Sequence, residues 1–396
     1  MKTKLLFVIE SLNAGGAERS LVTLLNNLNY DKYDVDLQLF VIGGEFYSLV
    51  PKNVNILPTP TYFRYTSIKY SNLLRKISHP RYLISQIIYS LKIHIGHYNH
   101  TQEAVIFWKC CHSCFEKLDT TYDVAIAYAQ GVPTFYVADK VKASKKIAWI
   151  NAVYLPQGGY LNFISKKLKK YNYISCVSKI VYENFELLFS SHKHKAVIIK
   201  DLLSRSFILK MANMDEPFEY KDKDNILLSV GRLSESKGFD LAIEACKILI
   251  DRNFKFTWFV IGDGDQKQFL KDKIRQNHLD NVFILLGSKG NPYPYFKKCN
   301  YYVQTSKSEG FGLTIAEAKM FAKPIVTTDF SSINLQIKNN QNGLIVSKSP
   351  ESIAEGIQKL FENRDMCTKF INNLKQEKID NLEEIDKFYK LLDNNI

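Results

Sequence analysis

The sequence predicts an α/β protein with two doubly wound parallel sheets. Three observations support this: the length of the chain, a strand–turn–helix unit at its start, and a regular alternation of strands and helices in its second half. At 396 residues, the chain exceeds what one hydrophobic core usually spans, and 46% of it is apolar. We therefore expect domains at 1–204 and 205–380, followed by an amphipathic helix at 381–396.

The first half opens with a short apolar strand at 5–9. Gly15 and Gly16 mark the turn after it, and a helix at 17–28 carries four leucines on one face. A second strand follows at 35–42. This order is typical of a doubly wound domain, in which ligands bind beyond the carboxyl ends of the strands.

A Tyr-, Ile- and Lys-rich stretch at 62–117 interrupts the alternation and is expected to be helical. Strand patterns return later in the first half at 123–129, 146–150 and 173–177. We expect the connection between the domains to run through the polar segment 205–225.

The second half alternates regularly, which predicts a second doubly wound sheet. Its expected strands lie at 226–230, 257–261, 282–285, 301–304 and 325–327.

The net charge of +13 is concentrated in the first half of the chain. Residues 1–200 contain 25 Lys and Arg against 13 Asp and Glu, whereas residues 201–396 contain 28 against 27. One cluster stands out, formed by Lys166, Lys167, Lys169 and Lys170. A basic surface of this kind favours anionic partners, either a membrane or a nucleic acid.

The sequence contains neither a stretch of about 18 apolar residues nor a cleavable leader, so we expect a cytoplasmic or peripheral protein. Seven cysteines without a repeating pattern suit a reducing compartment. The Cys110-Cys111-His112 run with Cys114 lacks a second pair of ligands, so we expect buried thiols and no metal.

The strongest functional signal lies at 306–317, where Glu309 and Glu317 are eight positions apart. Between them, Gly310, Phe311 and Gly312 lead into a helix expected at 313–321. Glycines let the backbone approach a ligand, and the free N–H groups of a helix start attract anions. This pattern predicts a site for a phosphorylated ligand.

This pattern resembles the donor site of retaining glycosyltransferases of the GT-B fold, in particular family 4 (glycosyltransferase group 1), which includes enzymes of bacterial capsule and surface polysaccharides. Two upstream motifs strengthen the resemblance, which is close from 226 to 346 and only general before that. Gly231-Arg232 followed by Lys237 resembles the pyrophosphate-binding pair of that family. Gly262 and Gly264 resemble its short glycine turn.

The resemblance implies two Rossmann-like domains facing across a cleft and transfer of a sugar, with retention, from a nucleotide-diphosphate sugar. Arg232 and Lys237 would stabilise charge on the leaving diphosphate. Leu313 and Thr314 would supply N–H groups at the helix start. In the resembling enzymes Glu317 would hold the ribose, while Glu309 would contact the donor sugar. Neither a metal nor a cofactor is implied.

In the first domain, the loop with Gly15, Gly16 and Glu18 resembles the family loop that faces the donor phosphates and the acceptor. Asn151 stands where many relatives carry a His; it can donate a hydrogen bond but cannot take up a proton near neutral pH. Asp201 lies in a segment where relatives often show Asn. The last segment, 381–396, is expected to cross back onto the first domain.

The implied acceptor is a glycan or lipid-linked oligosaccharide, and a UDP-sugar is favoured as donor by its prevalence among relatives. The basic first half, with the aromatic and aliphatic residues of 62–117, would let the protein dock on the anionic inner face of the cell membrane. Two alternatives stay open: a nucleotide-sugar epimerase of similar architecture and a basic nucleic-acid-binding protein. No nucleic-acid-binding module is visible, and we expect no nucleic-acid partner.

Overall fold

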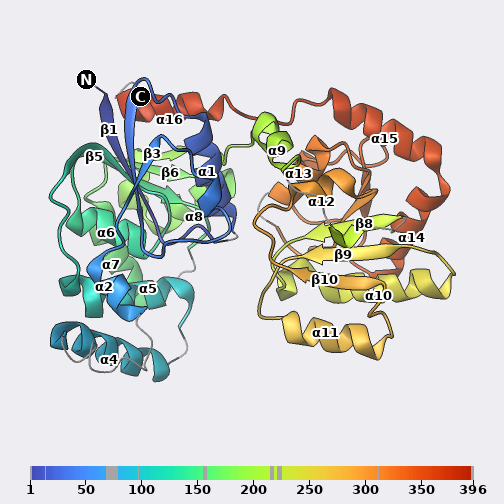
Figure 1. Ribbon diagram of the computed structural model, residues 1–396, viewed down its shortest axis with the longest axis horizontal. Helices are drawn as coiled ribbons and strands as arrows, with labels where there is room; N and C mark the ends of the chain where they lie inside the picture. Colours follow the sequence, from blue (N-terminus) through green and yellow to red (C-terminus); the bar gives the residue numbers. More distant parts are fainter. Residues whose placement is uncertain are drawn as a thin grey trace. The chain divides into compact units, whose positions relative to one another are not determined.

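The protein is described by a computed structural model that forms two compact units (Figure 1), Met1–Leu202 with Leu382–Ile396, and Leu203–Asn381. The structure describes residues 2–13, 15–67, 79–96, 98–154, 158–214, 218–220, 225–309 and 312–393. Each unit contains one parallel sheet covered by helices, so the predicted fold class is confirmed.

The first unit contains a seven-stranded parallel sheet in the order β3-β2-β1-β4-β5-β6-β7. Its strands are β1 (Thr3–Ile9), β2 (Tyr33–Leu39), β3 (Val54–Leu57), β4 (Thr121–Ala127), β5 (Lys142–Ile150), β6 (Tyr173–Cys176) and β7 (Ala196–Ile198). Its helices are α1 (Gly16–Asn27), α2 (Thr61–Thr66), α4 (Pro80–His94), α5 (His100–Cys111), α6 (Val132–Lys140), α7 (Gly158–Leu168), α8 (Lys179–Leu188) and α16 (Glu384–Asp393), with shorter turns η1 (Tyr47–Leu49), η3 (His112–Cys114) and η4 (Ser190–Lys195).

The second unit contains a six-stranded parallel sheet in the order β10-β9-β8-β11-β12-β13. Its strands are β8 (Ile226–Val230), β9 (Thr257–Ile261), β10 (Phe283–Gly287), β11 (Tyr301–Gln304), β12 (Ile325–Thr328) and β13 (Leu344–Val346). Its helices are α9 (Arg205–Met211), α10 (Phe239–Asp251), α11 (Lys267–Gln276), α12 (Tyr293–Lys298), α13 (Leu313–Met320), α14 (Pro350–Glu362) and α15 (Arg364–Gln376), with shorter turns η5 (Phe218–Tyr220), η6 (Glu235–Lys237) and η7 (Ile333–Leu335).

The strand order reverses at one point in each sheet, between β1 and β4 in the first unit and between β8 and β11 in the second. Loops leave such a point in opposite directions and open a crevice at the carboxyl ends of the strands, where ligands of doubly wound folds bind. The motif residues after β8 and after β11 therefore leave their sheet side by side.

The segment 205–225, expected as a connection, instead begins with helix α9 of the second unit. The Ser204 hydroxyl accepts a hydrogen bond from the Phe207 backbone N–H at 3.3 Å and starts this helix. Ile208 and Met211 are buried. The prediction of a linker was wrong because two buried apolar side chains are enough to anchor this two-turn helix. Such a short helix is not visible as a periodic pattern within a mostly polar segment.

The predicted helical stretch at 62–117 contains α2, α4 and α5, while residues 68–78 and His97 lie outside the described residues. Its cysteines take part in helix packing: the Tyr62 hydroxyl donates to Cys111 Sγ at 3.1 Å, and Cys114 Sγ lies 3.1 Å from Ser85 Oγ. Among the described residues, no group of three or more His, Cys, Asp or Glu side chains forms a potential metal site. Within the same ranges, no helix has the length and apolar character to cross a membrane.

The C-terminal helix α16 packs on the sheet of the first unit (Figure 1). Phe388 is fully buried, with ring centroids 6.1 Å from Phe7 and 5.9 Å from Trp149. The Lys145 ammonium donates to the Leu391 carbonyl at 2.6 Å, which places a cation at the carboxyl end of the helix. The ring of Phe388 and the hydrogen bond from Lys145 thus attach α16 to the sheet of the first unit.

Part of the lysine cluster stabilises the fold. Lys167 and Lys170 both form ion pairs with Asp139 at the end of α6, and the Trp108 indole N–H donates to the same carboxylate at 2.9 Å. Partial burial alone would raise the pKa of Asp139, but the hydrogen bonds from the two lysines and Trp108 outweigh it and lower the pKa to about 2. The docking role of the lysine cluster stays a prediction, and two of its members also stabilise the fold through Asp139.

The first prediction concerns α16. Phe388→Ala should lower the free energy of unfolding of the first unit by about 3–5 kcal/mol, because it leaves a cavity between the helix and the sheet. Urea unfolding measures this when it is followed by tryptophan fluorescence, to which Trp108 and Trp149 of this unit and Trp258 of the other contribute. Lys390→Ala, an exposed change on the same helix, should alter it by less than about 0.5 kcal/mol. Equal effects of the two changes would mean that α16 is not docked in solution.

The second prediction concerns Asp139. Since its folded-state pKa lies below the ordinary value of 3.8, the ionised carboxylate stabilises the fold above about pH 4, and that contribution disappears as the pH falls towards 2. Allowing for solvent screening, it should amount to about 1–2 kcal/mol. The stability difference between wild type and Asp139→Asn, measured by denaturation from pH 7 to pH 2.5, should shrink over this acidic range. A difference independent of pH would contradict the assignment.

Candidate functional site

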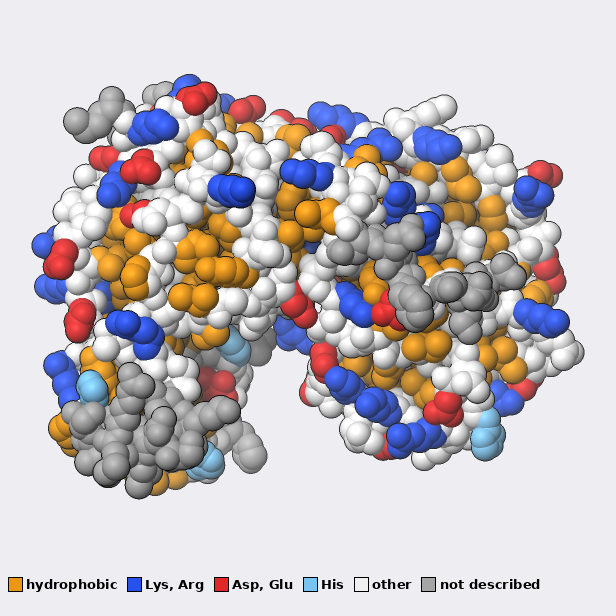
Figure 2. Space-filling view, in the orientation of Figure 1, with side chains coloured by type: hydrophobic (Ala, Val, Ile, Leu, Met, Phe, Trp, Pro, Cys, Tyr) orange, Lys and Arg blue, Asp and Glu red, His pale blue; other side chains and the backbone are white. Residues whose placement is uncertain are grey.

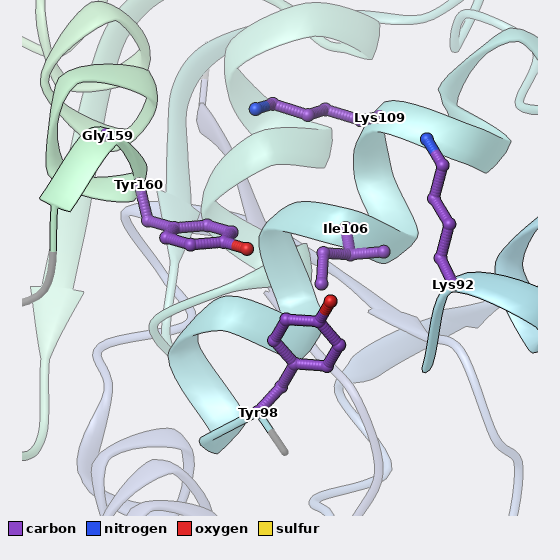
Figure 3. Close-up of a pocket in the computed structure, with 6 residues that line it drawn as sticks. All are labelled: Lys92, Tyr98, Ile106, Lys109, Gly159 and Tyr160. Atoms are coloured by element: carbon purple, nitrogen blue, oxygen red, sulfur yellow. The ribbon is translucent and has the colours of Figure 1, made fainter. Parts of the chain in front are cut away.

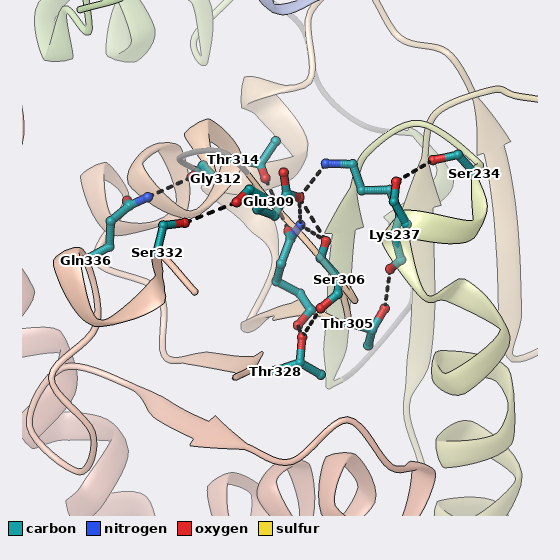
Figure 4. Close-up of polar contacts among 12 residues, drawn as sticks. Ser234, Lys237, Thr305, Ser306, Glu309, Gly312, Thr314, Thr328, Ser332 and Gln336 are labelled. Atoms are coloured by element: carbon teal, nitrogen blue, oxygen red, sulfur yellow. Dashed lines mark hydrogen bonds and ion pairs between the residues drawn. The ribbon is translucent and has the colours of Figure 1, made fainter. Parts of the chain in front are cut away.

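The carboxylate of Glu309 is the centre of a hydrogen-bond network at the end of β11 (Figure 4). Its Oε1 accepts hydrogen bonds from Gln304 Nε2 and Ser306 Oγ, each at 2.8 Å. The same oxygen accepts from the Lys237 ammonium, which makes an ion pair. The Glu309 side chain is only 11% exposed, so these donors replace the water that an ionised carboxylate needs.

Gln304 connects this carboxylate to the start of α13. Its amide Nε2 donates to Ser306 and Glu309, while its Oε1 accepts from the hydroxyls of Tyr302 at 2.5 Å and Thr314 at 3.2 Å. Gln304 is buried, so its amide is fully used and its orientation is fixed. Sequence reasoning missed Gln304 and Ser306; the available signal was a polar residue that ends an apolar strand at the ligand-binding edge.

Lys237 is positioned by a close contact between the loops that follow β8 and β11. The Thr305 hydroxyl donates to the Lys237 carbonyl at 3.0 Å. Gly238, at φ +64°, lies so close to the Thr305 carbonyl that a Cβ atom would be 2.1 Å from its oxygen. Only glycine fits here, because both the backbone angle and the space exclude a side chain. The structure thus brings Lys237 and Glu309 together, as the sequence motifs suggested.

Gly262 and Gly264 have a packing role at the end of β9. A Cβ atom on Gly262, at φ +152°, would lie 1.9 Å from the Gly231 carbonyl oxygen, and one on Gly264 would lie 2.4 Å from that of Leu233. These glycines therefore let the backbones of the loops after β8 and β9 pack directly against each other. Arg232 lies on the loop after β8 with an exposed side chain, and among the described residues no hydrogen bond or ion pair engages its guanidinium.

The start of α13 offers backbone N–H groups next to this network. Gly312 adopts the left-handed conformation before the helix, and its carbonyl accepts from Gln336 Nε2 at 3.1 Å. Among the described residues, no side chain caps the helix. Leu313 and Thr314 form its first turn, whose N–H groups have no partner within the helix itself. Gly310 and Phe311 lie outside the described residues.

Glu317 is fully buried on α13, so its carboxylate is not a solvent-exposed charge on the helix surface. The hydroxyl of Tyr293, from α12, donates to its Oε1 at 3.2 Å. Tyr293 is itself 2% exposed. Glu317 and Glu309 thus extend from the same loop–helix unit into different surroundings, one lined by a tyrosine and the other by a lysine.

In the first unit, Gly15 and Gly16 form the start of α1, and Glu18 lies in its first turn. The Glu18 carboxylate folds back over this start, since a Cβ atom on Gly15 would lie 2.1 Å from its Oε2. A negative charge at a helix start stabilises the helix dipole and repels a second anion. The role of this loop at the donor phosphates and the acceptor stays a prediction.

Asn151 follows β5 at the same edge of the first sheet. Its Nδ2 donates to the Tyr128 carbonyl at 2.9 Å, which fixes the side chain. Its Oδ1 is buried and has no hydrogen-bond partner among the described residues. Since a buried polar atom without a partner costs free energy, Asn151 offers an acceptor for a hydroxyl or N–H group.

A buried polar cluster supports both of these positions. The hydroxyls of Ser20, on α1, and Tyr128, after β4, lie 2.9 Å apart, and the Tyr128 ring stacks on Trp149 at 4.6 Å. Burial raises the pKa of nearby Asp201 to about 6, although a hydrogen bond with Ser20 opposes the rise. Ser20 and Tyr128 were not expected from the sequence, since nothing in their spacing relates them.

Residues 211–377 match the family described as Glycosyl transferases group 1. The chain carries a glycosyl transferases group 1 domain. The described site residues of the second unit, from Gly231 to Glu317, lie within it.

Curated relatives cover different shares of the chain. Two uncharacterized glycosyltransferases of Methanocaldococcus jannaschii are 24% and 29% identical over 56% and 49% of this chain, and the matches span 64% and 50% of their own lengths. A longer match, 24% identical over 94% of this chain and 93% of the relative, is to the GalNAc-α-(1→4)-GalNAc-α-(1→3)-diNAcBac-PP-undecaprenol α-1,4-N-acetyl-D-galactosaminyltransferase of Campylobacter jejuni.

Solved structures show the same fold over almost the whole chain. Anabaena HepE in complex with UDP and glucose is 17% identical, with a TM-score of 0.68 over 99% of this chain and 100% of that one. TarM of S. aureus is 14% identical, with a TM-score of 0.65 over 99% and 100%. The chain therefore has the fold of GT-B glycosyltransferases, as the sequence predicted.

The third prediction concerns the Lys237–Glu309 pair. A double-mutant cycle of Lys237→Met and Glu309→Gln, measured by chemical denaturation, should give a favourable coupling of about 1–2 kcal/mol, because the pair is largely shielded from water. The exposed Lys247–Asp251 pair on α10 serves as a control and should give about 0.5 kcal/mol or less. Equal couplings in the two cycles would mean that the site pair is not formed in solution.

Proposed function

We propose that this protein transfers a sugar from a nucleotide-diphosphate sugar, with a UDP-sugar as the favoured donor, to a hydroxyl of a glycan or lipid-linked oligosaccharide during surface polysaccharide biosynthesis. The observation that carries the proposal is the joint position of Lys237, Glu309 and the uncapped start of α13 at the switch point of the second sheet. Relatives named for transfer to an undecaprenol-linked glycan and for amylovoran biosynthesis support the acceptor class.

In this proposal the positive groups stabilise the leaving diphosphate. Negative charge grows on its oxygens as the glycosidic bond breaks, and cations or N–H groups already aimed there lower the barrier. Arg232 has an exposed guanidinium free to meet one phosphate. Lys237 would bridge the other phosphate and Glu309, and the N–H groups of Leu313 and Thr314 complete the cradle. The chain's own cations then suffice, and no metal is required.

The two carboxylates have separate roles in the proposal. Glu309 is held by three donors on one oxygen, which leaves its other oxygen to accept from a donor-sugar hydroxyl. Glu317, buried beside Tyr293, would bind the ribose diol. The leaving phosphate can itself receive the acceptor proton on the same face of the sugar, so the anomeric configuration is retained without a protein base.

On the acceptor side, we assign Glu18 and Asn151. The Glu18 carboxylate at the start of α1 can accept hydrogen bonds from hydroxyl groups, and the buried Oδ1 of Asn151 has no hydrogen-bond partner among the described residues. Neither residue needs to move a proton near neutral pH. We further propose that the reaction takes place in the cytoplasm, at the inner face of the cell membrane.

The fourth prediction tests the donor site with UDP-, GDP- and ADP-sugars. A UDP-sugar should raise the melting temperature of the purified chain, since a ligand bound only by the folded state stabilises it.

Lys237→Ala should reduce turnover by a factor on the order of a hundred or more. Glu317→Gln should weaken the binding of both UDP and the UDP-sugar by about 1.5–3 kcal/mol.

Lys247→Ala, an exposed change on α10, is the control for the lysine substitution and should leave turnover unchanged. Proton NMR of the product reports whether the configuration is retained. Normal turnover in Lys237→Ala would refute the role of that residue. If Glu317→Gln weakened only the sugar-bearing donor, the roles of the two carboxylates would have to be exchanged.

A further inference from the structure

Helix α4 presents an aliphatic stripe to solvent. Five large side chains on it or directly after it are between 42% and 82% exposed: Ile84, Ile87, Ile88, Leu91 and Ile95. Their spacings of three and four residues place them on one face of the helix. An exposed apolar patch of this extent usually marks an interaction surface.

The opposite face of α4 fastens the helix to the first unit. Ser85 is buried against Cys114, and the ring of Tyr82 lies 5.5 Å from that of Tyr62. Tyr89 meets Phe107 edge to face at 5.3 Å. The usual arrangement of a surface helix is thus reversed, because the small polar and aromatic side chains point inward while the aliphatic ones point outward.

The edges of the stripe are cationic. Helix α4 contains no Asp or Glu, whereas Arg81, Lys92 and His94 flank the aliphatic residues. Lys92 also lines a pocket of about 340 Å³ with Lys109 (Figure 3). In that view, the hydroxyls of Tyr98 and Tyr160 point towards the middle of the pocket. Ammonium and phenol groups are suitable donors to phosphate oxygens.

The net charge of the chain does not by itself define this surface. On the face shown in Figure 2, Lys and Arg side chains are spread over both units and alternate with Asp and Glu. Two lysines of the cluster near residue 168 are bound to Asp139. The combination of exposed apolar side chains with Arg81 and Lys92 beside them is found on α4.

An anionic lipid surface fits both properties of this helix. Transfer of apolar side chains from water to the acyl boundary lowers the free energy, while Lys and Arg at the edge remain among the headgroup phosphates. A second copy of the chain fits poorly, because a two-fold contact through this face would set the same cationic borders against each other. We propose that α4 lies in the plane of an anionic lipid bilayer, with its five aliphatic side chains inserted.

This inference rests on the proposed function, since it assigns the membrane contact to one helix, and its test does not depend on activity. The fifth prediction is that the full chain floats with vesicles of phosphatidylcholine and phosphatidylglycerol at 70:30, and less with phosphatidylcholine alone. Binding should weaken as salt rises. Leu91→Glu combined with Ile95→Glu should reduce the affinity at least tenfold. Leu187→Glu removes an equally exposed aliphatic residue, 80% exposed on α8, and should leave binding unchanged.

A second measurement reports insertion directly. In Leu91→Trp, the added fluorescence should shift to shorter wavelength on vesicles and be quenched by brominated lipid, whereas Leu187→Trp should show neither effect. Three outcomes would overturn the proposal: no flotation, equal flotation of wild type and the double variant, or a dimer by light scattering that the double variant abolishes. Since the double variant should keep its thermal shift with UDP-sugars, loss of lipid binding is distinguished from loss of the donor site.

Discussion

The arrangement of the second unit depends on one buried charge. Glu309 is almost removed from water, and an ionised carboxylate in that position is stable only if donors surround it. Those donors come from three places in the chain: Lys237 from the β8 loop, Gln304 from the end of β11, and Ser306 from the loop between β11 and α13. Satisfying one carboxylate therefore fixes the relative positions of two loops and a helix start.

The glycines make this convergence possible. Gly238 allows the β8 loop to touch the Thr305 carbonyl, and Gly262 allows the β9 loop to close over Gly231. A side chain at either point would separate loops that must lie within hydrogen-bond distance. Gly238 and Gly262 thus have a structural role, because they let two backbone segments pack directly against each other.

The first unit uses a different means to hold its ligand-facing edge. Ser20, Tyr128 and Asp201 form a buried cluster beneath the start of α1, and Tyr128 also accepts from Asn151 through its carbonyl. The C-terminal helix packs on the same sheet through Phe388 and Lys145. The two termini of the chain are consequently part of one folding unit, although the second unit lies between them in sequence.

The sequence alone predicted the fold class and most strands, because apolar strands and glycine turns follow from local physics. It also predicted a donor motif through the resemblance to family 4, and that assignment stays a prediction. Strands β3, β7 and β13 were not expected from the sequence. These strands have three or four residues and lie at the edges of their sheets, where the apolar pattern is weaker than in a central strand, and α9 is likewise a short element. Only the tertiary structure shows that Gln304 donates a hydrogen bond to Glu309, and that Lys167 and Lys170 form ion pairs with Asp139. The same holds for the outward face of α4, since helical periodicity shows which residues share a face but not which face meets the core.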